Sequence, residues 1–332
     1  MSTTDPSLGF DSLLEALKAA AEPTRLRMLA LLARTELTVS DLTRILGQSQ
    51  PRVSRHLKLM DEAGLLERHR EGAWVFYRLA GPAVRSGFAQ VLAAFVAGDD
   101  PVIARDLARL DGVRAARAEA AAAYFRASAS RWDEIRALYV PEEQVEQAIA
   151  AIIGPEPVGD VVDLGTGTGR VLALLAARAQ RAVGIDASPE MLTIARAALD
   201  AAGLAQAQVR LGDLYNLPMA DASADLVTVH HVLHFLEDPA AAVAEAARVL
   251  RPGGRLLMAD FAPHDIESLR TDHAHRRLGF ADREVRAWCE AAGLTLETTR
   301  ALEPGEGTGR ITVMLWLARR RAGRARTRLE AA

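Results

Sequence analysis

The chain has 332 residues, 50% of them hydrophobic and 25% charged, which is too long for one ordinary hydrophobic core and predicts two domains. The formal net charge of −3 excludes a general polycation, so any nucleic-acid-binding surface must be local. Cys289 is the one cysteine, which excludes a disulfide framework and a cysteine metal site. The sequence has neither a signal-peptide pattern nor an apolar run long enough to cross a membrane, so we expect a cytoplasmic protein without a membrane partner.

The first part of the chain, residues 1–98, has the pattern of short helices that end in a hairpin. Thr38 and Gly47 can cap the two ends of one helix, and a second helix is expected from Pro51 to Gly64. The remaining elements are two strand-like segments, 65–70 and 74–79, and helices at 11–22, from Pro23 onward and at 83–97.

The second part has a different organisation. Residues 99–140 predict a linker and a helical cover, and from 141 to 318 strand-like segments alternate with helices. This alternation is typical of an α/β domain with a doubly wound, Rossmann-like sheet. The tail, 319–332, is basic. The strand candidates are 160–165, 181–186, 208–213, 225–230, 255–261 and 311–318.

A glycine-rich loop follows the first of these strands. The buried strand VVDL runs into Gly165, Gly167 and Gly169, and an apolar helix begins directly afterwards. Glycine lets the backbone turn tightly and lets a ligand approach main-chain N–H groups at the start of a helix. A GxGxG pattern alone suits nicotinamide cofactors as well as others, so its surroundings must decide between them.

Acidic residues end the next two strands. Asp186 ends the segment RAVGID, where a carboxylate can accept hydrogen bonds from both ribose hydroxyls, and Gly212-Asp213 end the third strand. Together with VHHVLHFLEDP and RVLRPGGRLLMAD, this series resembles the class I S-adenosylmethionine-dependent methyltransferases, in particular the group that includes the ubiquinone/menaquinone methyltransferases. The resemblance spans residues 120–318 and implies S-adenosyl-L-methionine as cofactor.

The resemblance also implies roles for single residues. Asp163 would organise the loop near the methionine amino group, Asp186 would hold the ribose, and Asp213 would accept from the adenine amino group. Met191 could pack on the adenine, or belong to the core. The full set of cofactor-binding candidates is Asp163, Gly165, Thr166, Gly167, Gly169, Asp186, Ala187, Met191, Gly212, Asp213, Leu214 and His230.

Methyl transfer from a sulfonium asks the protein mainly to align a nucleophile and exclude water, and a base is needed only if the nucleophile arrives protonated. His230 and His231, at the end of the fourth strand, are the catalytic candidates, whereas a histidine at position 234 more often has a non-catalytic role. His273 and His275 are two residues apart, a poor spacing for a metal on a helix, so no metal is expected. The expected pocket for an unknown small-molecule methyl acceptor, which could instead be a solvated helix face, comprises Tyr124, His264, His273, His275 and Arg276.

The first domain resembles a winged helix-turn-helix of the arsenical-resistance-repressor (ArsR) family. The residues that carry this resemblance are AEPTRLRMLALL, ELTVSDL and VSRHLKLMDEAGLLERHREGAWVFYRL. Operator DNA is the implied partner, because polar and basic side chains at the start of one helix can reach base edges and phosphates in the major groove. The candidate contacts are Gln48, Ser49, Gln50, Arg52, Ser54, Arg55 and His56 on that helix and Arg70 in the wing.

One departure from the ArsR pattern changes the expected function. Metal-sensing members carry cysteines in the segment that reads ELTVSDL here. Thr38 and Ser40 occupy those positions in this chain, and hydroxyls are poor ligands for thiophilic metals. Helices 11–22 and 83–97 have apolar faces suited to a homodimer on a palindromic operator. Three hypotheses follow: a regulator fused to a working methyltransferase, a regulator that only senses the cofactor or its product, and a methyltransferase whose first domain serves dimerisation.

Overall fold

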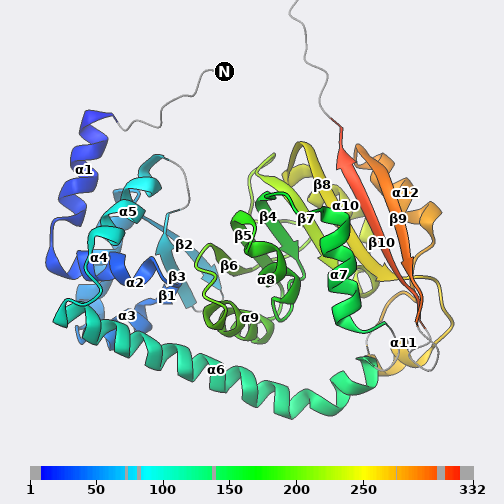
Figure 1. Cartoon of the computed structure of the whole chain (residues 1–332), viewed down its shortest axis with the longest axis horizontal. Coiled ribbons are helices and arrows are strands. Elements are labelled where there is room, and N and C mark those ends of the chain that lie inside the picture. The colour runs from blue at the N-terminus through cyan, green and yellow to red at the C-terminus, as the bar shows by residue number, and fades with distance from the viewer. Residues whose placement is uncertain are drawn as a thin grey trace, which may run out of the picture.

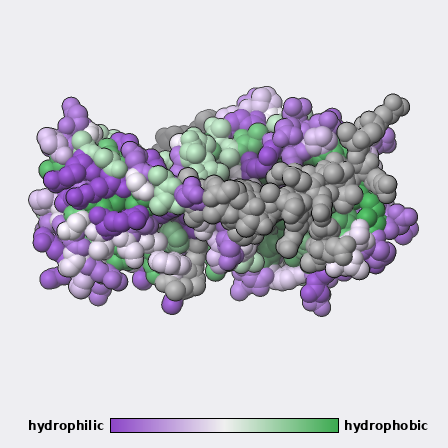
Figure 2. Space-filling model, turned by 90° about the horizontal axis from the view of Figure 1, so that it is seen from below, coloured by the Kyte–Doolittle hydropathy of each residue, from purple (hydrophilic) through white to green (hydrophobic). Residues whose placement is uncertain are grey.

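The computed structural model describes residues 9–71, 74–80, 84–136, 140–273, 275–304 and 311–321. Two bodies lie side by side, and one long helix, α6 (Pro101–Arg136), runs along both of them (Figure 1). Most of the expected basic tail lies outside the described residues. Seen from the side of α6, the surface of the N-terminal body carries many hydrophilic residues (Figure 2).

The N-terminal body is a winged helix-turn-helix, as predicted. Thr38 and Asp41 form a reciprocal capping box at the start of α3, and Gly47 ends that helix in the left-handed conformation at φ 66°. The hairpin β2–β3 forms the wing, and β1 pairs antiparallel with β3. The elements are α1 (Phe10–Ala20), α2 (Pro23–Leu32), β1 (Leu37–Thr38), α3 (Val39–Leu46), α4 (Gln50–Glu62), β2 (Leu66–Glu71), β3 (Trp74–Leu79) and α5 (Val84–Phe95).

The first half of α6 belongs to the core of this body. Leu110 and Val113 are buried in the same hydrophobic cluster as Met28 of α2. Arg27 donates through two nitrogens to Asp106, at 2.6 and 2.8 Å, and Asp106 is only 1% exposed. A bidentate pair of this kind fixes both position and orientation, so α6 is anchored to the N-terminal body before it reaches the second one.

The C-terminal body has a seven-stranded sheet in the order β6-β5-β4-β7-β8-β10-β9. The strands from β6 to β8 are parallel, and β10 is antiparallel to both of its neighbours. The six strands expected from the sequence are present, and β9, which the sequence pattern did not reveal, forms the edge. The strands are β4 (Gly159–Leu164), β5 (Ala179–Asp186), β6 (Ala207–Leu211), β7 (Ala224–His230), β8 (Leu250–Phe261), β9 (Leu294–Leu302) and β10 (Val313–Arg320).

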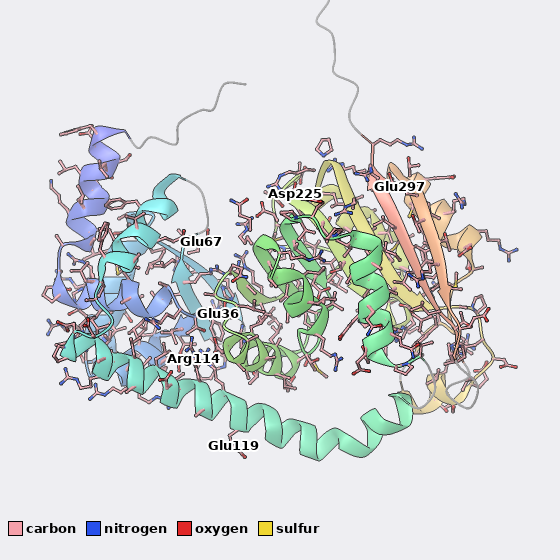
Figure 3. All side chains as sticks on the ribbon, viewed as in Figure 1. Glu36, Glu67, Arg114, Glu119, Asp225 and Glu297 are labelled. Carbon is pink, nitrogen blue, oxygen red and sulfur yellow. The ribbon has the colours of Figure 1, made fainter. Side chains whose placement is uncertain are left out.

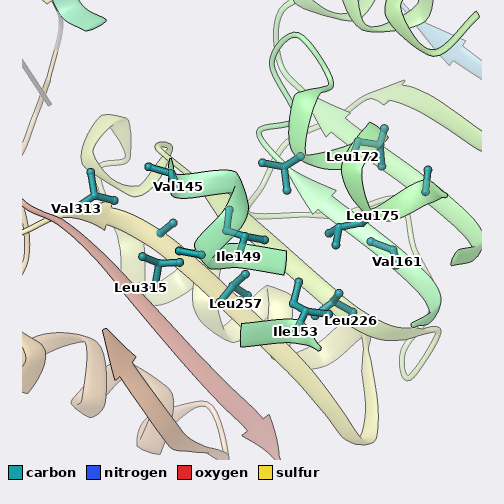
Figure 4. Packing of buried hydrophobic residues seen from close by; sticks show 14 of the residues in the cluster. Val145, Ile149, Ile153, Val161, Leu172, Leu175, Leu226, Leu257, Val313 and Leu315 are labelled. Atoms are coloured by element: carbon teal, nitrogen blue, oxygen red, sulfur yellow. The ribbon is translucent and has the colours of Figure 1, made fainter. Parts of the chain in front are cut away.

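Helices cover both faces of this sheet. Val145, Ile149 and Ile153 follow one face of α7 at a spacing of four residues and pack against sheet residues that include Leu257 and Leu315 (Figure 4). Helices α8 and α9 share this layer, while α10 and α12 bury their apolar sides on the opposite face. The helices are α7 (Glu142–Ile153), α8 (Arg170–Ala176), α9 (Pro189–Ala201), η1 (Leu233–Phe235), α10 (Pro239–Val249), α11 (Ser268–His273) and α12 (Asp282–Ala291).

Within the described ranges, no helix combines the length and the apolar character needed to cross a membrane. The longest one, α6, is interrupted by charged side chains along its whole length.

Candidate functional site

The strand order creates a switch point at the carboxyl end of β4. From β4 the chain proceeds outward to β5 and β6 on one side, and then continues with β7 and β8 on the other. In open α/β sheets, ligands bind in the crevice where the strand order reverses. The glycine loop follows β4 at this position. Asp186, which ends β5, and Asp213, which follows β6, lie along the same edge.

The backbone of the glycine loop is held in a conformation that few other residues adopt. Gly165 and Gly167 have φ values of 66° and 53°. A Cβ on Gly165 would lie 2.2 Å from Val232, whereas the nearest atom to a Cβ on Gly167 would be a carbonyl oxygen at 4.0 Å. Gly165 is therefore required for close packing inside the site. Gly167 leaves an open backbone surface, which suits the approach of a ligand.

Asp163 ties the loop to the neighbouring strand. Its two carboxylate oxygens accept hydrogen bonds from the hydroxyl of Thr228, at 2.6 Å, and from that of Thr166, at 2.7 Å. Burial raises the pKa of Asp163 from 3.8 to about 6, although both hydroxyls oppose this shift. The side chain is thus a fixed acceptor beneath the loop.

Asp163 should make the stability of this body depend on pH. Because its pKa is higher in the folded protein, its contribution to stability is present below about pH 4 and is lost as the pH rises through about 6. Asp163→Asn keeps the size of the side chain and removes the cost of burying a charge. We expect the variant to be more stable than wild type at pH 8 by up to about 3 kcal/mol, with a smaller difference near pH 4. Urea unfolding at several pH values measures this, and parallel stability curves would contradict the assignment.

Asp186 connects the loop to α9. One oxygen accepts from the backbone of Gly167 at 2.8 Å, and the other accepts from the backbone of Ser188 at 2.9 Å. The hydroxyl of Ser188 caps α9 by accepting from the N–H of Met191. The Asp186 carboxylate is half-buried and keeps acceptor capacity for a ligand, and Met191 lies half-buried one turn into the helix.

The remaining cofactor candidates lie beside these groups along the sheet edge. Asp213 is exposed after β6 and accepts from the N–H of Tyr215, and Leu214 is buried behind it. Open glycine backbone, two solvent-facing carboxylates and an adjacent apolar side chain match the amino-acid, ribose and adenine parts of S-adenosylmethionine. The residues present therefore fit this group.

A cluster of histidines lies next to the loop, at the carboxyl ends of β7 and β8. The rings of His230 and His231 are 4.3 Å apart between centroids, and His231 adopts a positive φ of 53°. Burial lowers the pKa of both imidazoles, and for His231 the neighbouring histidines lower it further. Both of the predicted catalytic candidates are therefore neutral near pH 7.

His234 and Asp260 form a buried pair that the sequence did not reveal. His234 Nδ1 lies 2.7 Å from an oxygen of Asp260, and the two residues are 2% and 0% exposed. The same carboxylate also accepts from the backbone of Phe261 and of His234 itself. His275 stacks on the ring of His234 with centroids 4.1 Å apart. A carboxylate in this position fixes the tautomer and the orientation of the imidazole.

The same residues could also hold a metal ion. His231, His234 and Asp260 each offer a ligand atom, and these atoms all lie within 4.8 Å of one another. Because Asp260 already accepts from the His234 ring and from two backbone N–H groups, a histidine–carboxylate pair accounts for the geometry without a metal.

The expected acceptor-pocket residues are divided between two places. His264 and Arg276 line a cleft of about 670 Å³ together with Arg270, Arg277 and acidic side chains. His275 is buried against His234 instead. Tyr124 lies in α6 and His273 in α11, and their side chains lie outside what the structure describes.

In the N-terminal body, five of the expected DNA contacts are exposed at the start of α4: Ser49, Gln50, Arg52, Ser54 and Arg55. Gln48 and His56 turn toward the body, because Gln48 donates to Thr24 and His56 lies 3.7 Å from Glu22. Arg70 is exposed near the end of the wing strand β2.

Comparisons with known proteins agree with this division. Residues 162–258 match the family model described as a methyltransferase domain, and residues 22–68 match that of the bacterial regulatory proteins of the arsR family. Over 63 residues the chain is 52% identical to the arsenic resistance transcriptional regulator ArsR1 of Pseudomonas putida, which covers 19% of this chain and 49% of that protein.

Two further relatives match the second part. The ubiquinone/menaquinone biosynthesis C-methyltransferase UbiE of Rubrivivax gelatinosus is 33% identical over 140 residues, 42% of this chain and 54% of that enzyme. An uncharacterized methyltransferase of Mycobacterium bovis is 44% identical over 102 residues, 31% and 40% of the two chains. The chain thus spans about half or less of the length of these curated relatives.

Fold, site and family models together define a winged helix-turn-helix followed by a Rossmann-like class I methyltransferase fold. More specifically, the first part of the chain is similar to the arsR-family regulators and the second part to the methyltransferases.

Proposed function

We propose that the protein is an operator-binding regulator whose second domain transfers a methyl group from S-adenosyl-L-methionine to a small molecule. The observation that carries this proposal is the His234–Asp260 pair beside an intact glycine loop. A domain that only senses the cofactor needs the loop but no oriented base, so the pair favours turnover over sensing.

The bound cofactor would supply an electrophilic methyl group on its sulfonium. Asp163 holds the loop in place. Asp186 would accept from the ribose and Asp213 from the adenine. His234 takes the proton of the attacking group at Nε2, while Asp260 holds the proton on Nδ1. The ring of His231 lies between those of His230 and His234, and the rings of His230 and His231 would help to exclude water.

The acceptor in this proposal is a molecule that arrives protonated, such as a phenol or a quinol. The names of relatives support this class, since they include a demethylmenaquinone methyltransferase of Thermus thermophilus. Tritium transfer from methyl-labelled cofactor to 1,4-naphthoquinol and a panel of phenols tests it. Tight cofactor binding by calorimetry with no transfer to any of these acceptors would favour the sensing hypothesis instead.

The N-terminal domain would bind its operator as a homodimer through α1 and α5. Phe10 and Leu17 on α1 and Val91 and Phe95 on α5 are exposed apolar side chains, with Phe95 83% exposed. Exposed apolar side chains gathered on two neighbouring helices are typical of a surface that pairs with another chain. We place the domain limits near residues 98 and 141, with α6 between them, and the chain in the cytoplasm with its operator.

Arg55→Ala should weaken operator binding by about tenfold and reduce the slope of log affinity against log salt by about one. Within the described part of the chain, Arg55 has no ion-pair partner, so its loss should leave the fold intact. Gel shifts at fixed salt, with an operator selected from random duplexes, measure this. Arg283→Ala, which removes the same charge from an exposed position on α12, is the matched control. Equal affinity of wild type and Arg55→Ala would favour a domain that serves only dimerisation.

A further inference from the structure

A cleft separates the regulator domain from the methyltransferase domain and is distinct from the cofactor site. Its volume is about 560 Å³, and it receives residues from α2, β3 and α5 on one side and from β5 and the segment before β6 on the other. Figure 3 shows Glu36 and Glu67 between the two bodies, above α6. The polar side chains that line it are Arg34, Thr35, Glu36, Arg78, Gln90, Gln180, Arg181 and Gln206.

Positive charge in this cleft exceeds the negative charge available to neutralise it. Arg78 donates only to the adjacent carbonyl of Leu79, at 3.4 Å, and no carboxylate of the described residues lies within ion-pair distance of it. Arg181, on the methyltransferase side of the cleft, lies 3.5 Å from Asp160 of the neighbouring strand β4. Arg210 of β6, next to the cleft, is 3.7 Å from Glu67 of the wing.

The one acidic side chain that lines the cleft is already committed. Glu36 is 2.5 Å from Arg196 of α9 and 3.7 Å from His69 of the wing. Burial lowers the pKa of Arg78 and of Arg210. The carboxylates of Glu36 and Glu67 oppose this shift, and neighbouring arginines add to it. The guanidinium of Arg78 is thus a partly buried cation without a carboxylate at ion-pair distance among the described residues, an arrangement that an anion in the cleft would stabilise.

We infer that this cleft binds a small oxyanion, a phosphate- or carboxylate-bearing molecule, with Arg78 and Arg181 as its ligands from the two domains. A guanidinium presents parallel N–H groups that match two oxygens of such a group, and the cleft is larger than a bare ion requires. The glutamine amides along the wall provide donors and acceptors for the rest of the molecule.

Binding here would connect the two functions of the chain. Arg78 lies in β3 of the wing, while Arg196, the partner of Glu36, lies in α9, the helix that begins next to Asp186. An anion held between Arg78 and Arg181 therefore contacts elements continuous with both the DNA-binding wing and the cofactor loop. Its affinity would depend on how the two domains are placed.

The test uses the full-length protein and three probes: inorganic phosphate, ribose 5-phosphate and citrate, each titrated by calorimetry at constant ionic strength set with NaCl. We expect saturable binding of at least one probe, and we expect Arg78→Gln and Arg181→Gln each to weaken it at least tenfold. Phosphate and ribose 5-phosphate binding without citrate would identify a phosphate ligand, and the reverse a carboxylate. Arg283→Gln, in α12, should bind like wild type.

Two results would overturn the inference: no saturable binding of any probe, or binding that both cleft variants retain. Arg78→Gln removes a cation without a carboxylate partner, so it should fold, and Arg181→Gln repeats the test from the other domain. S-adenosylmethionine affinity is measured on the same samples. Unchanged cofactor binding together with lost anion binding separates this cleft from the cofactor site.

Discussion

Asp186→Ala is expected to weaken S-adenosylmethionine binding by at least about a hundredfold, or about 2.7 kcal/mol. The carboxylate accepts from the backbone of Gly167 and of Ser188, so its removal releases the glycine loop and the first turn of α9 as well as the ribose contact. Hydrogen bonds to a charged group contribute about 1.5–3 kcal/mol each, which makes this estimate conservative. Isothermal titration with the cofactor and with its demethylated product measures the change.

Two other variants distinguish the ribose contact from a general loss of structure. Asp186→Asn keeps one oxygen for Gly167 but loses the charge, and should bind with intermediate affinity. Asp221→Ala removes a carboxylate that is 78% exposed, and should bind like wild type. Wild-type affinity in Asp186→Ala, with an unchanged unfolding transition, would show that the residue ending β5 does not hold the cofactor.

Much of the fold follows from local patterns in the sequence. The helix cap at Thr38, the helix end at Gly47 and the glycine loop each depend on residues that are close together in the chain, and their positions were predicted. The edge strand β9 was missed because its side chains are mostly exposed, so it lacks the apolar alternation that marks a half-buried strand. Edge strands of this kind are specified by pairing with β10 rather than by their own sequence.

Contacts between distant residues were beyond prediction from one sequence. The pair Arg27–Asp106 joins residues 79 positions apart, and Glu36–Arg196 joins residues 160 positions apart. Both require the complete tertiary arrangement, and they determine where α6 and α9 lie. The linker was predicted as a helix from its local sequence. The packing of its first half into the regulator core was not predicted, because it depends on these distant contacts.

The site shows the same division between local and long-range information. The cofactor residues follow a motif with fixed spacing, whereas the His234–Asp260 pair depends on β7 and β8 being neighbours. One signal in the sequence pointed to it: Asp260 ends the apolar run LLMA, and a carboxylate buried there requires a partner. The assignment of catalysis to His230 or His231 stays a prediction. Glutamine variants of these two residues and of His234 distinguish it from catalysis by His234.

His234→Gln is expected to lower methyl transfer to 1,4-naphthoquinol by about 10²–10⁴-fold, the range typical of general base catalysis, while cofactor affinity stays within about twofold. Asp260→Asn should cause a loss of similar order, because an amide no longer fixes the tautomer of the imidazole. Initial rates at saturating cofactor, with calorimetry on the same samples, separate transfer from binding.

Three comparisons make this prediction specific. His230→Gln and His231→Gln should retain most of the activity, and a large loss in either of them with an active His234→Gln would move the base to that histidine. Added imidazole should restore part of the activity of His234→Gly, since the missing ring leaves a buried space of its own size between Phe261 and His275. Loss of wild-type activity in a chelator, recovered by adding zinc, would instead mean that His231, His234 and Asp260 act together on a metal ion.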